Sequence, residues 1–233
     1  RHLSSAASDV YKRQNKDNEG EQLTHERFRK EYGCADEEAL NYDPKTTTPM
    51  ILAVGRLAAR KGYVSLIRAL PLIIKEHEHA KLIIVGRGHM KKRLLKVADE
   101  LGVRDSLFIK SAMSFEDPAQ HYRSADLVVF PSYYEGQGLI PLEALASGTP
   151  VVTVNQEPLT EMIDDTVGGL FDRGDYVGLA QAVCDELNGH VQRVKKAKAG
   201  RKRVLENFTL EGQAESYEDV FLRSVQKRRW RDS

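Results

Sequence analysis

Short apolar runs alternate with longer, helix-like segments over most of this chain. Five runs rich in Val, Ile and Leu are typical of buried β-strands, and they lie at 50–54, 81–85, 106–110, 126–130 and 150–154. Segments with apolar residues three or four positions apart predict helices at 62–78, 89–101, 116–124, 139–147, 158–164, 175–188, 191–206 and 209–228. This alternation favours an α/β fold, a Rossmann-like parallel sheet with helices on both faces.

The richest candidate chemistry follows the strand at 126–130. Glu135 and Glu143 stand eight residues apart, on either side of a glycine-rich turn that opens a helix. Ligands of parallel sheets bind at the carboxyl ends of the strands, where this turn is predicted to lie. The free amides of the helix start suit phosphate, and the carboxylates suit hydroxyl groups. We therefore expect a sugar nucleotide to contact the residues Gly136, Gln137, Gly138, Leu139, Ile140 and Glu143.

A second motif follows the first strand: Gly55-Arg56-Leu57, and then Lys61-Gly62, with Gly55 expected to contact the nucleotide. Two loop cations are more often simply solvated. Aimed at a diphosphate leaving group, however, Arg56 and Lys61 would stabilise the charge that develops as a glycosidic bond breaks. Arg can hold phosphate oxygens with two parallel bonds, while Lys acts as a point charge.

Gly86 and Gly88 follow the second strand. A dinucleotide-binding turn would need a third glycine at position 91, which is Lys91, so a hydride-transfer enzyme is not expected. A tight strand-to-helix turn explains most of this signal. We also expect these two glycines to let the backbone approach the nucleotide closely.

In this order and spacing, the motifs resemble those of retaining GT-B glycosyltransferases of family 4, the glycosyl transferases group 1. The resemblance runs from about Met50 to Leu187, and it includes the segments 125–132 and 147–152. It implies the C-terminal, donor-nucleotide domain of an enzyme that transfers a sugar from a UDP-, GDP- or ADP-sugar to a hydroxyl acceptor. It also implies retention of the anomeric configuration, no bound metal and no cofactor besides the donor.

The resemblance implies distinct roles for the charged residues. Glu143 would hold the ribose hydroxyls, and Glu135 would face the donor sugar and be essential for transfer. Arg56 and Lys61 would be catalytic cations in the place that Mg²⁺ takes elsewhere. One departure is Gln137, where many relatives carry Phe, and another is the segment 155–157, which replaces a frequent pair of glycines.

Two other functions stay open at this point. The same motifs serve sugar-nucleotide epimerases of GT-B architecture, and a non-catalytic module could bind a nucleotide sugar. Residues 1–14 resemble a translated library adapter, although a natural polar terminus is the alternative, and we expect the chain to be a C-terminal fragment. We further expect an interdomain remnant at 15–49, the nucleotide-sugar domain at 50–190 and basic helices at 191–233.

The charge balance limits the classes of molecule that we expect the chain to bind. The chain has 35 basic and 34 acidic residues, and this balance gives no bulk attraction to nucleic acid.

Cys34 and Cys184 are expected to be reduced thiols, and His77 and His79 to lie on a solvated, acidic helix end without binding metal. No apolar run approaches the roughly 20 residues of a membrane span, so we expect a cytoplasmic protein. The basic stretch 193–203 could rest on anionic lipid, with an ordinary exposed helix as the alternative.

Overall fold

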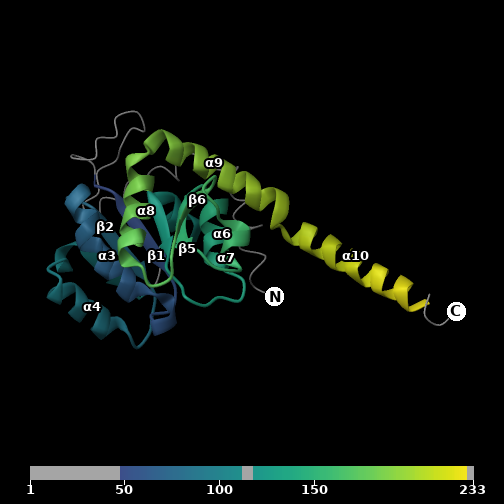
Figure 1. The fold of residues 1–233 in the computed structure, drawn as a ribbon, viewed down its shortest axis with the longest axis horizontal. Helices are drawn as coiled ribbons and strands as arrows, with labels where there is room; N and C mark the ends of the chain where they lie inside the picture. Colours follow the sequence, from purple (N-terminus) through teal and green to yellow (C-terminus); the bar gives the residue numbers. More distant parts are fainter. Residues whose placement is uncertain (1–47, 112–117, 230–233) are drawn as a thin grey trace.

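The computed structural model describes residues 48–111 and 118–229 of the chain. Its centre is one sheet of parallel strands in the order β3-β2-β1-β4-β5-β6, covered by helices (Figure 1). The strands are β1 (Met50–Val54), β2 (Lys81–Val85), β3 (Leu107–Lys110), β4 (Leu127–Phe130), β5 (Val151–Val154) and β6 (Gly168–Phe171). This order confirms the predicted Rossmann-like α/β fold.

Helices connect the strands and extend the chain beyond the sheet. The α-helices are α3 (Tyr63–Glu76), α4 (Lys91–Glu100), α5 (Pro118–Ser124), α6 (Leu139–Ala146), α7 (Leu159–Met162), α8 (Tyr176–Asn188), α9 (His190–Asn207) and α10 (Leu210–Arg229). Two short 3₁₀ helices, η1 (Ala59–Lys61) and η2 (Arg104–Ser106), were not predicted. Most helix bounds agree with the sequence prediction to within two residues, although α7 is a single turn.

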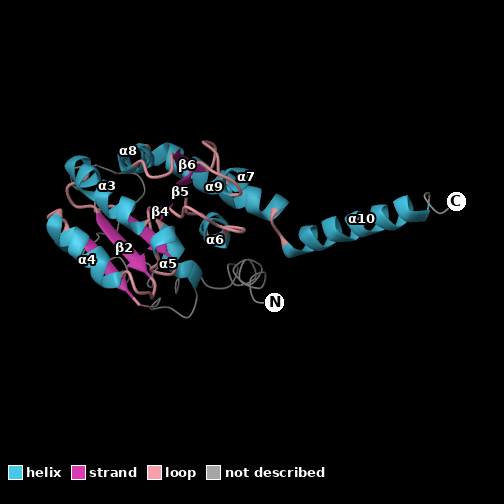
Figure 2. Ribbon diagram, turned by 60° about the horizontal axis from the view of Figure 1, so that its bottom comes forward, coloured by secondary structure: helices cyan, strands magenta, loops and turns pink. Residues whose placement is uncertain are grey.

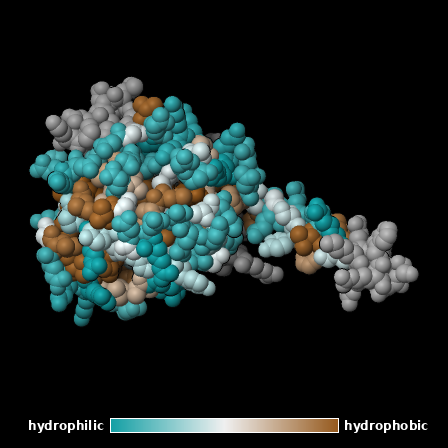
Figure 3. Space-filling model, viewed as in Figure 1, coloured by the Kyte–Doolittle hydropathy of each residue, from teal (hydrophilic) through white to brown (hydrophobic). Residues whose placement is uncertain are grey.

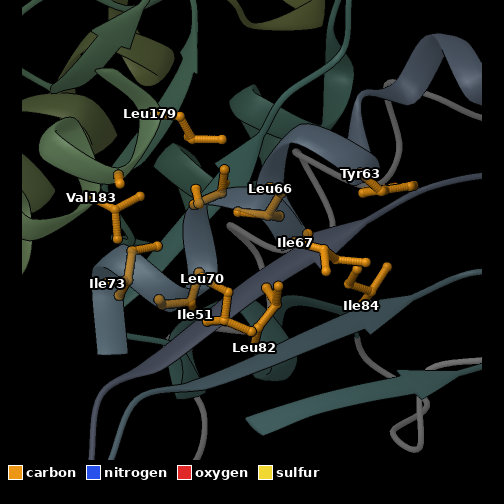
Figure 4. Close-up of a cluster of buried hydrophobic side chains, with 14 of the residues drawn as sticks. Ile51, Tyr63, Leu66, Ile67, Leu70, Ile73, Leu82, Ile84, Leu179 and Val183 are labelled. Carbon is orange, nitrogen blue, oxygen red and sulfur yellow. The ribbon is translucent and has the colours of Figure 1, made fainter. Parts of the chain in front are cut away.

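The sheet separates two apolar cores because successive side chains of a strand point to opposite faces. Ile51 and Ala53 of β1 pack with α3, α4 and α8, as the close-up in Figure 4 shows for Ile51, Leu66 and Leu179. Their neighbours along β1 face the second core, with α5, α6, α7 and α9. In Figure 2 the helices therefore lie on both sides of the strands.

Strand β6 is the one strand of the described chain that the apolar pattern did not predict. It begins with Gly168 and Gly169, which have no side chains to give an apolar period. A Cβ at Gly168 would lie 2.0 Å from the carbonyl oxygen of Val151, on the neighbouring strand β5. The close approach of the two strands therefore requires glycine where a sequence pattern would require Val or Ile.

The C-terminal helix α10 projects from the body of the molecule (Figures 1 and 2). It leaves apolar side chains exposed, among them Val220, Phe221 and Val225, and Figure 3 shows such side chains on the projection. Among the described residues, no helix is both long and apolar enough to span a bilayer. The adapter-like residues 1–14, the remnant at 15–47 and Cys34 lie outside the described residues.

Candidate functional site

The candidate site lies where the order of the strands reverses, between β1 and β4. From β1 the chain proceeds to β2 and β3 on one side, and β4 begins the other side with β5 and β6. The loops that follow β1 and β4 thus leave the same edge of the sheet in opposite directions. Doubly wound sheets bind their ligands in the crevice that this divergence creates.

The loop after β1 is shaped by two glycines. Gly55 has a φ of 141°, and a Cβ there would lie 2.9 Å from the hydroxyl oxygen of Tyr63. Gly62 adopts the left-handed conformation with φ 68°, and a Cβ there would meet the carbonyl oxygen of Pro131 at 1.9 Å. Only glycine lets this loop turn into α3 while it packs against the end of β4. The turn η1 places Lys61 at that contact.

Lys61 and Glu135 form the central contact of the site. The Lys61 Nζ lies 2.5 Å from the Glu135 Oε1, and the two side chains are only 9% and 13% exposed. The hydroxyl of Ser132 donates to the same carboxylate oxygen, and the Arg60 Nη1 lies 3.6 Å from it. The Lys61 Nζ also stands 5.0 Å from the centre of the Phe130 ring. The structure therefore brings together two predicted catalytic residues from separate loops.

Arg56, the third predicted catalytic residue, does not join this contact. Its side chain is exposed, and among the described residues it forms no ion pair. Its backbone is fixed, because the next residue, Leu57, donates to the carbonyl of Arg87 at 2.9 Å. Arg56 is exposed on the loop after β1, and its contact with phosphate stays a prediction.

The glycines after β2 lie very close to other backbone atoms. A Cβ at Gly86 would lie 1.8 Å from the carbonyl oxygen of Gly55, and one at Gly88 would lie 2.3 Å from that of Leu57. The partner of this close approach is thus the loop after β1. These glycines fix the position of the loop that carries Arg56 and Lys61, while their own contact with a nucleotide stays a prediction.

Helix α6 begins beside the same loop. Gly138 is its N-cap, with φ 72° and no side-chain capping bond, so the amides of the first turn lack an intrahelical partner. The Ile140 side chain would touch a Cβ at Gly55 at 3.6 Å, which places the helix start next to the loop after β1. Gly136 and Gln137 lie exposed before it. Both the amides and the Lys61 loop can therefore contact one anion.

Glu143, one turn into α6, already has a hydrogen-bond partner. The hydroxyl of the buried Tyr122 donates to its Oε2 at 2.8 Å. Burial raises the pKa of the Glu143 carboxyl, and the bond from Tyr122 opposes this rise in part. Burial, followed by the negative charge of Glu143, raises the pKa of the Tyr122 hydroxyl. The carboxylate is thus oriented at one oxygen and retains acceptor capacity for a ligand.

Two tyrosines link the two carboxylates electrostatically. Burial raises the pKa of Tyr63, and the charge of Glu135 raises it further. Beyond the effect of burial, the pKa of Tyr122 is raised by the charge of Glu143 and, to a smaller extent, by Tyr63. Each carboxylate therefore raises the pKa of one buried tyrosine, Glu135 that of Tyr63 and Glu143 that of Tyr122. Sequence reasoning missed both tyrosines because a buried Tyr on a helix looks the same whether it fills a core or supports a carboxylate.

The loop that carries Glu135 is held by several bonds to Tyr133. Its hydroxyl lies 2.5 Å from the Ser65 Oγ, and its amide donates to the carbonyl of Arg60 at 2.8 Å. The Gln156 side chain donates to the Tyr133 carbonyl at 2.8 Å, and the Arg173 guanidinium lies 5.3 Å from the Tyr133 ring centre. The departure from the usual glycines at 155–157 therefore supplies a side chain that supports this loop.

One histidine was predicted wrongly. His77 is fully buried, and only His79 lies exposed as expected. The reason is that α3 ends at Glu76, and His77 leaves the helix with φ −124° and ψ 77°. This turn moves its side chain from the solvated face into the protein. Cys184 is a free, buried thiol, as expected.

The sequence matches the model of one family, the glycosyl transferases group 1, over residues 36–203. An uncharacterized glycosyltransferase of Methanocaldococcus jannaschii is 40% identical over 144 residues, which are 62% of this chain and 34% of that protein. The GDP-mannose-dependent alpha-(1-6)-phosphatidylinositol monomannoside mannosyltransferase of Mycobacterium tuberculosis is 32% identical over 164 residues, 67% of this chain and 43% of that protein.

A solved structure is similar as well. Sucrose-phosphate synthase from Thermosynechococcus elongatus is 28% identical with a TM-score of 0.68, and the match covers 81% of this chain and 48% of that one. The chain thus spans between a third and a half of the length of these relatives.

Proposed function

The chain belongs to the glycosyl transferases group 1 family, and from that membership we propose that it supplies the donor site of a glycosyltransferase. The donor is a nucleotide diphosphate sugar with uridine, guanosine or adenosine as its base. The acceptor is a hydroxyl group. The mycobacterial relative is named a GDP-mannose-dependent mannosyltransferase, which supports this class of donor.

The observation that carries the proposal is the pair of Lys61 and Glu135 at the reversal of the strand order. A nearly buried ammonium group is costly without a counter-charge. Glu135 supplies that charge, and a diphosphate can take its place. Exchange of partners would leave Lys61 on the phosphate and turn Glu135 towards the sugar.

The other groups fit the remaining parts of such a donor. The first-turn amides of α6 and the exposed Arg56 can hold the diphosphate oxygens, because both present donors or positive charge to an anion. Glu143, oriented by Tyr122, can accept bonds from the ribose hydroxyls. The contacts to phosphate and to ribose are made with groups that the substrate and the diphosphate product share.

Transfer breaks the bond between the sugar C1 and the diphosphate oxygen, and the electron pair leaves with the diphosphate. Lys61, Arg56 and the helix amides stabilise the charge on that leaving group more as the bond breaks, which lowers the barrier. The acceptor oxygen forms the new bond to C1, and its proton passes to the departing diphosphate oxygen. We propose that the configuration at C1 is retained, and that these cations take the electrostatic role that Mg²⁺ has in other transferases.

Contact with lipid through α9 gains little from the arrangement of its charges. Among the seven basic residues of the stretch 193–203, three pair with acidic groups of the body: Arg193 with Asp126, Lys196 with Glu186, and Arg203 with Asp164. These three charges serve the attachment of α9 to the sheet domain. Peripheral contact with a membrane stays a prediction that rests on the other four and on the basic tail 227–231. Of the four, Lys202 pairs with Glu206 within α9.

Calorimetric titration of the 233-residue chain tests the donor proposal. UDP-, GDP- and ADP-sugars are titrated with and without Mg²⁺, with the corresponding nucleosides as the reference for binding without phosphate. We expect one base class to bind, and Lys61→Ala to weaken that binding without changing the nucleoside reference. Lys96→Ala is the matched control, since Lys96 is an exposed helix lysine that pairs only with Glu100 among the described residues. Equal weakening by both variants would refute the assignment.

A further inference from the structure

A second group of polar side chains lies at the opposite end of α3 from the donor site. Glu76 and His77 stand where α3 ends, and Cys184 faces them from α8. One carboxylate oxygen, one imidazole nitrogen and the thiol sulfur all lie within 4.8 Å of one another. The length of α3 separates this group from Lys61 by about 20 Å, at a rise of ~1.5 Å per residue.

The three side chains converge because two helices pack together. Helix α3 lies against α8 in the first core, where Ile73 and Val183 are neighbours in Figure 4. His77 is fully buried and Cys184 is 1% exposed, whereas Glu76 is exposed. Two donors of the group are therefore fixed within the protein, and the third can reach it from the surface.

We propose that Glu76, His77 and Cys184 bind one Zn²⁺ ion. Imidazole, thiolate and carboxylate are the three ligand types that zinc takes from proteins, and a water at the exposed side would complete a tetrahedron. Bonds of about 2.0 to 2.3 Å place tetrahedral ligands roughly 3.3 to 3.7 Å apart. Side-chain rotation on binding would close the remaining separation, and Glu76, the exposed member, has the most room to move.

The surroundings of the group support this arrangement. The Cys184 sulfur and a Glu76 carboxylate oxygen lie within 4.8 Å of each other, so two of the proposed ligand atoms are already close. Binding of the ion releases the thiol proton to solvent. The Asn188 amide donates to the Glu76 Oε2 at 3.4 Å and can orient the carboxylate, as outer-shell partners of metal ligands do.

The nearby charges are balanced. The Arg193 guanidinium lies 3.8 Å from the Asp126 carboxylate. Asp185, which follows Cys184 in α8, carries a negative charge. A cation at this position therefore meets no uncompensated positive charge among these neighbours. The ion would join the end of α3 to α8, and its role would be to stabilise the fold rather than to serve the donor site.

Zinc affinity of the untagged, metal-stripped full chain tests the proposal. A chromophoric chelator competes for Zn²⁺ in one assay, and Co²⁺ replaces it in another, where a thiolate ligand produces a charge-transfer band in the near ultraviolet. We expect one ion per chain, a higher Tm with zinc, and a cobalt band. Cys184→Ala and Glu76→Gln should weaken binding by more than the roughly 10- to 100-fold that loss of an outer-shell partner costs.

Two matched variants complete the design. Cys34→Ala removes the other thiol, and His79→Ala removes the exposed neighbouring imidazole; both should bind zinc as the parent chain does. Glu76 is exposed, so Glu76→Gln keeps the test valid if Cys184→Ala fails to fold. The proposal is overturned if the chain binds no stoichiometric zinc, if both ligand variants bind it unchanged, or if Cys34→Ala abolishes the cobalt band.

Discussion

Glu135→Gln should tighten the binding of a nucleoside diphosphate. Glu135 engages Lys61 at 2.5 Å, so a phosphate that binds Lys61 has to displace this carboxylate. The glutamine amide can accept the same hydrogen bond, but it has no charge to compete with phosphate. The change therefore removes the competitor and preserves the shape of the loop.

The magnitude follows from the burial of the pair. Exposed ion pairs contribute about 0.2 to 1 kcal/mol, and breaking a buried pair costs about 3 to 5 kcal/mol. With exposures of 9% and 13%, and with Ser132 and Arg60 still beside the carboxylate, we place the net cost of separation near 1 kcal/mol. Its removal predicts roughly fivefold tighter binding, since about 1.4 kcal/mol is a factor of ten.

Calorimetry of the parent chain, Glu135→Gln, Lys61→Ala and the double variant measures this effect. Lys61→Ala should weaken diphosphate binding by roughly 100-fold, in keeping with the ~3 kcal/mol of a preorganised charge contact. Glu135→Gln should have little effect once Lys61 is absent, because only the half-exposed Arg60 then remains as a cation beside the carboxylate. Weakening by Glu135→Gln as large as that by Lys61→Ala would refute the competition and make the pair a single structural unit.

Further predictions concern stability and the ribose contact. Glu143→Gln should weaken the binding of nucleoside and of diphosphate alike, as calorimetry measures. It should also remove a pH dependence of stability. Because the pKa of Glu143 is raised on folding, the parent chain should lose stability as the pH rises from the ordinary pKa of 4.5 through the pKa of the folded state, which melting curves at several pH values would show or disprove. Tyr122→Phe removes the bond to Glu143 and should lower the free energy of unfolding by about 1 kcal/mol, as urea titration measures, whereas no change would mean that the bond contributes nothing. Gly62→Ala should destabilise the fold far more than Gly102→Ala, because both glycines have φ near 70° but only the first Cβ meets backbone, at 1.9 Å from the Pro131 oxygen; equal urea midpoints would contradict this.

Much of this architecture follows from the chain's local patterns. The apolar runs predict five of the six strands, and the rule that ligands bind at the carboxyl ends of strands predicts the edge that holds Lys61 and Glu135. The contact itself joins residues 74 positions apart. No local pattern gives the distance between two loops, so Ser132 and Arg60 were missed as partners of Glu135.

The sequence also could not predict the roles of residues that depend on which elements pack against them. Gly168 belongs to a strand because β5 passes too close for a side chain, and that is a property of the sheet. His77 is buried because one residue leaves the helix, whereas helical periodicity continued past it. Gln156 supports the Glu135 loop through the backbone of Tyr133, which a motif comparison registers only as a lost glycine.

The position at which a nucleoside diphosphate binds shows whether the donor site lies at the reversal of the strand order. Amide resonances of the isotope-labelled chain are followed by NMR during titration with the base that binds best by calorimetry. We expect the largest changes in amide chemical shift at the start of α6, in Leu139 and Ile140, and in the loop from Gly55 to Gly62. Shifts confined to other parts of the chain, such as the exposed helix α10, would contradict a donor site at the reversal of the strand order.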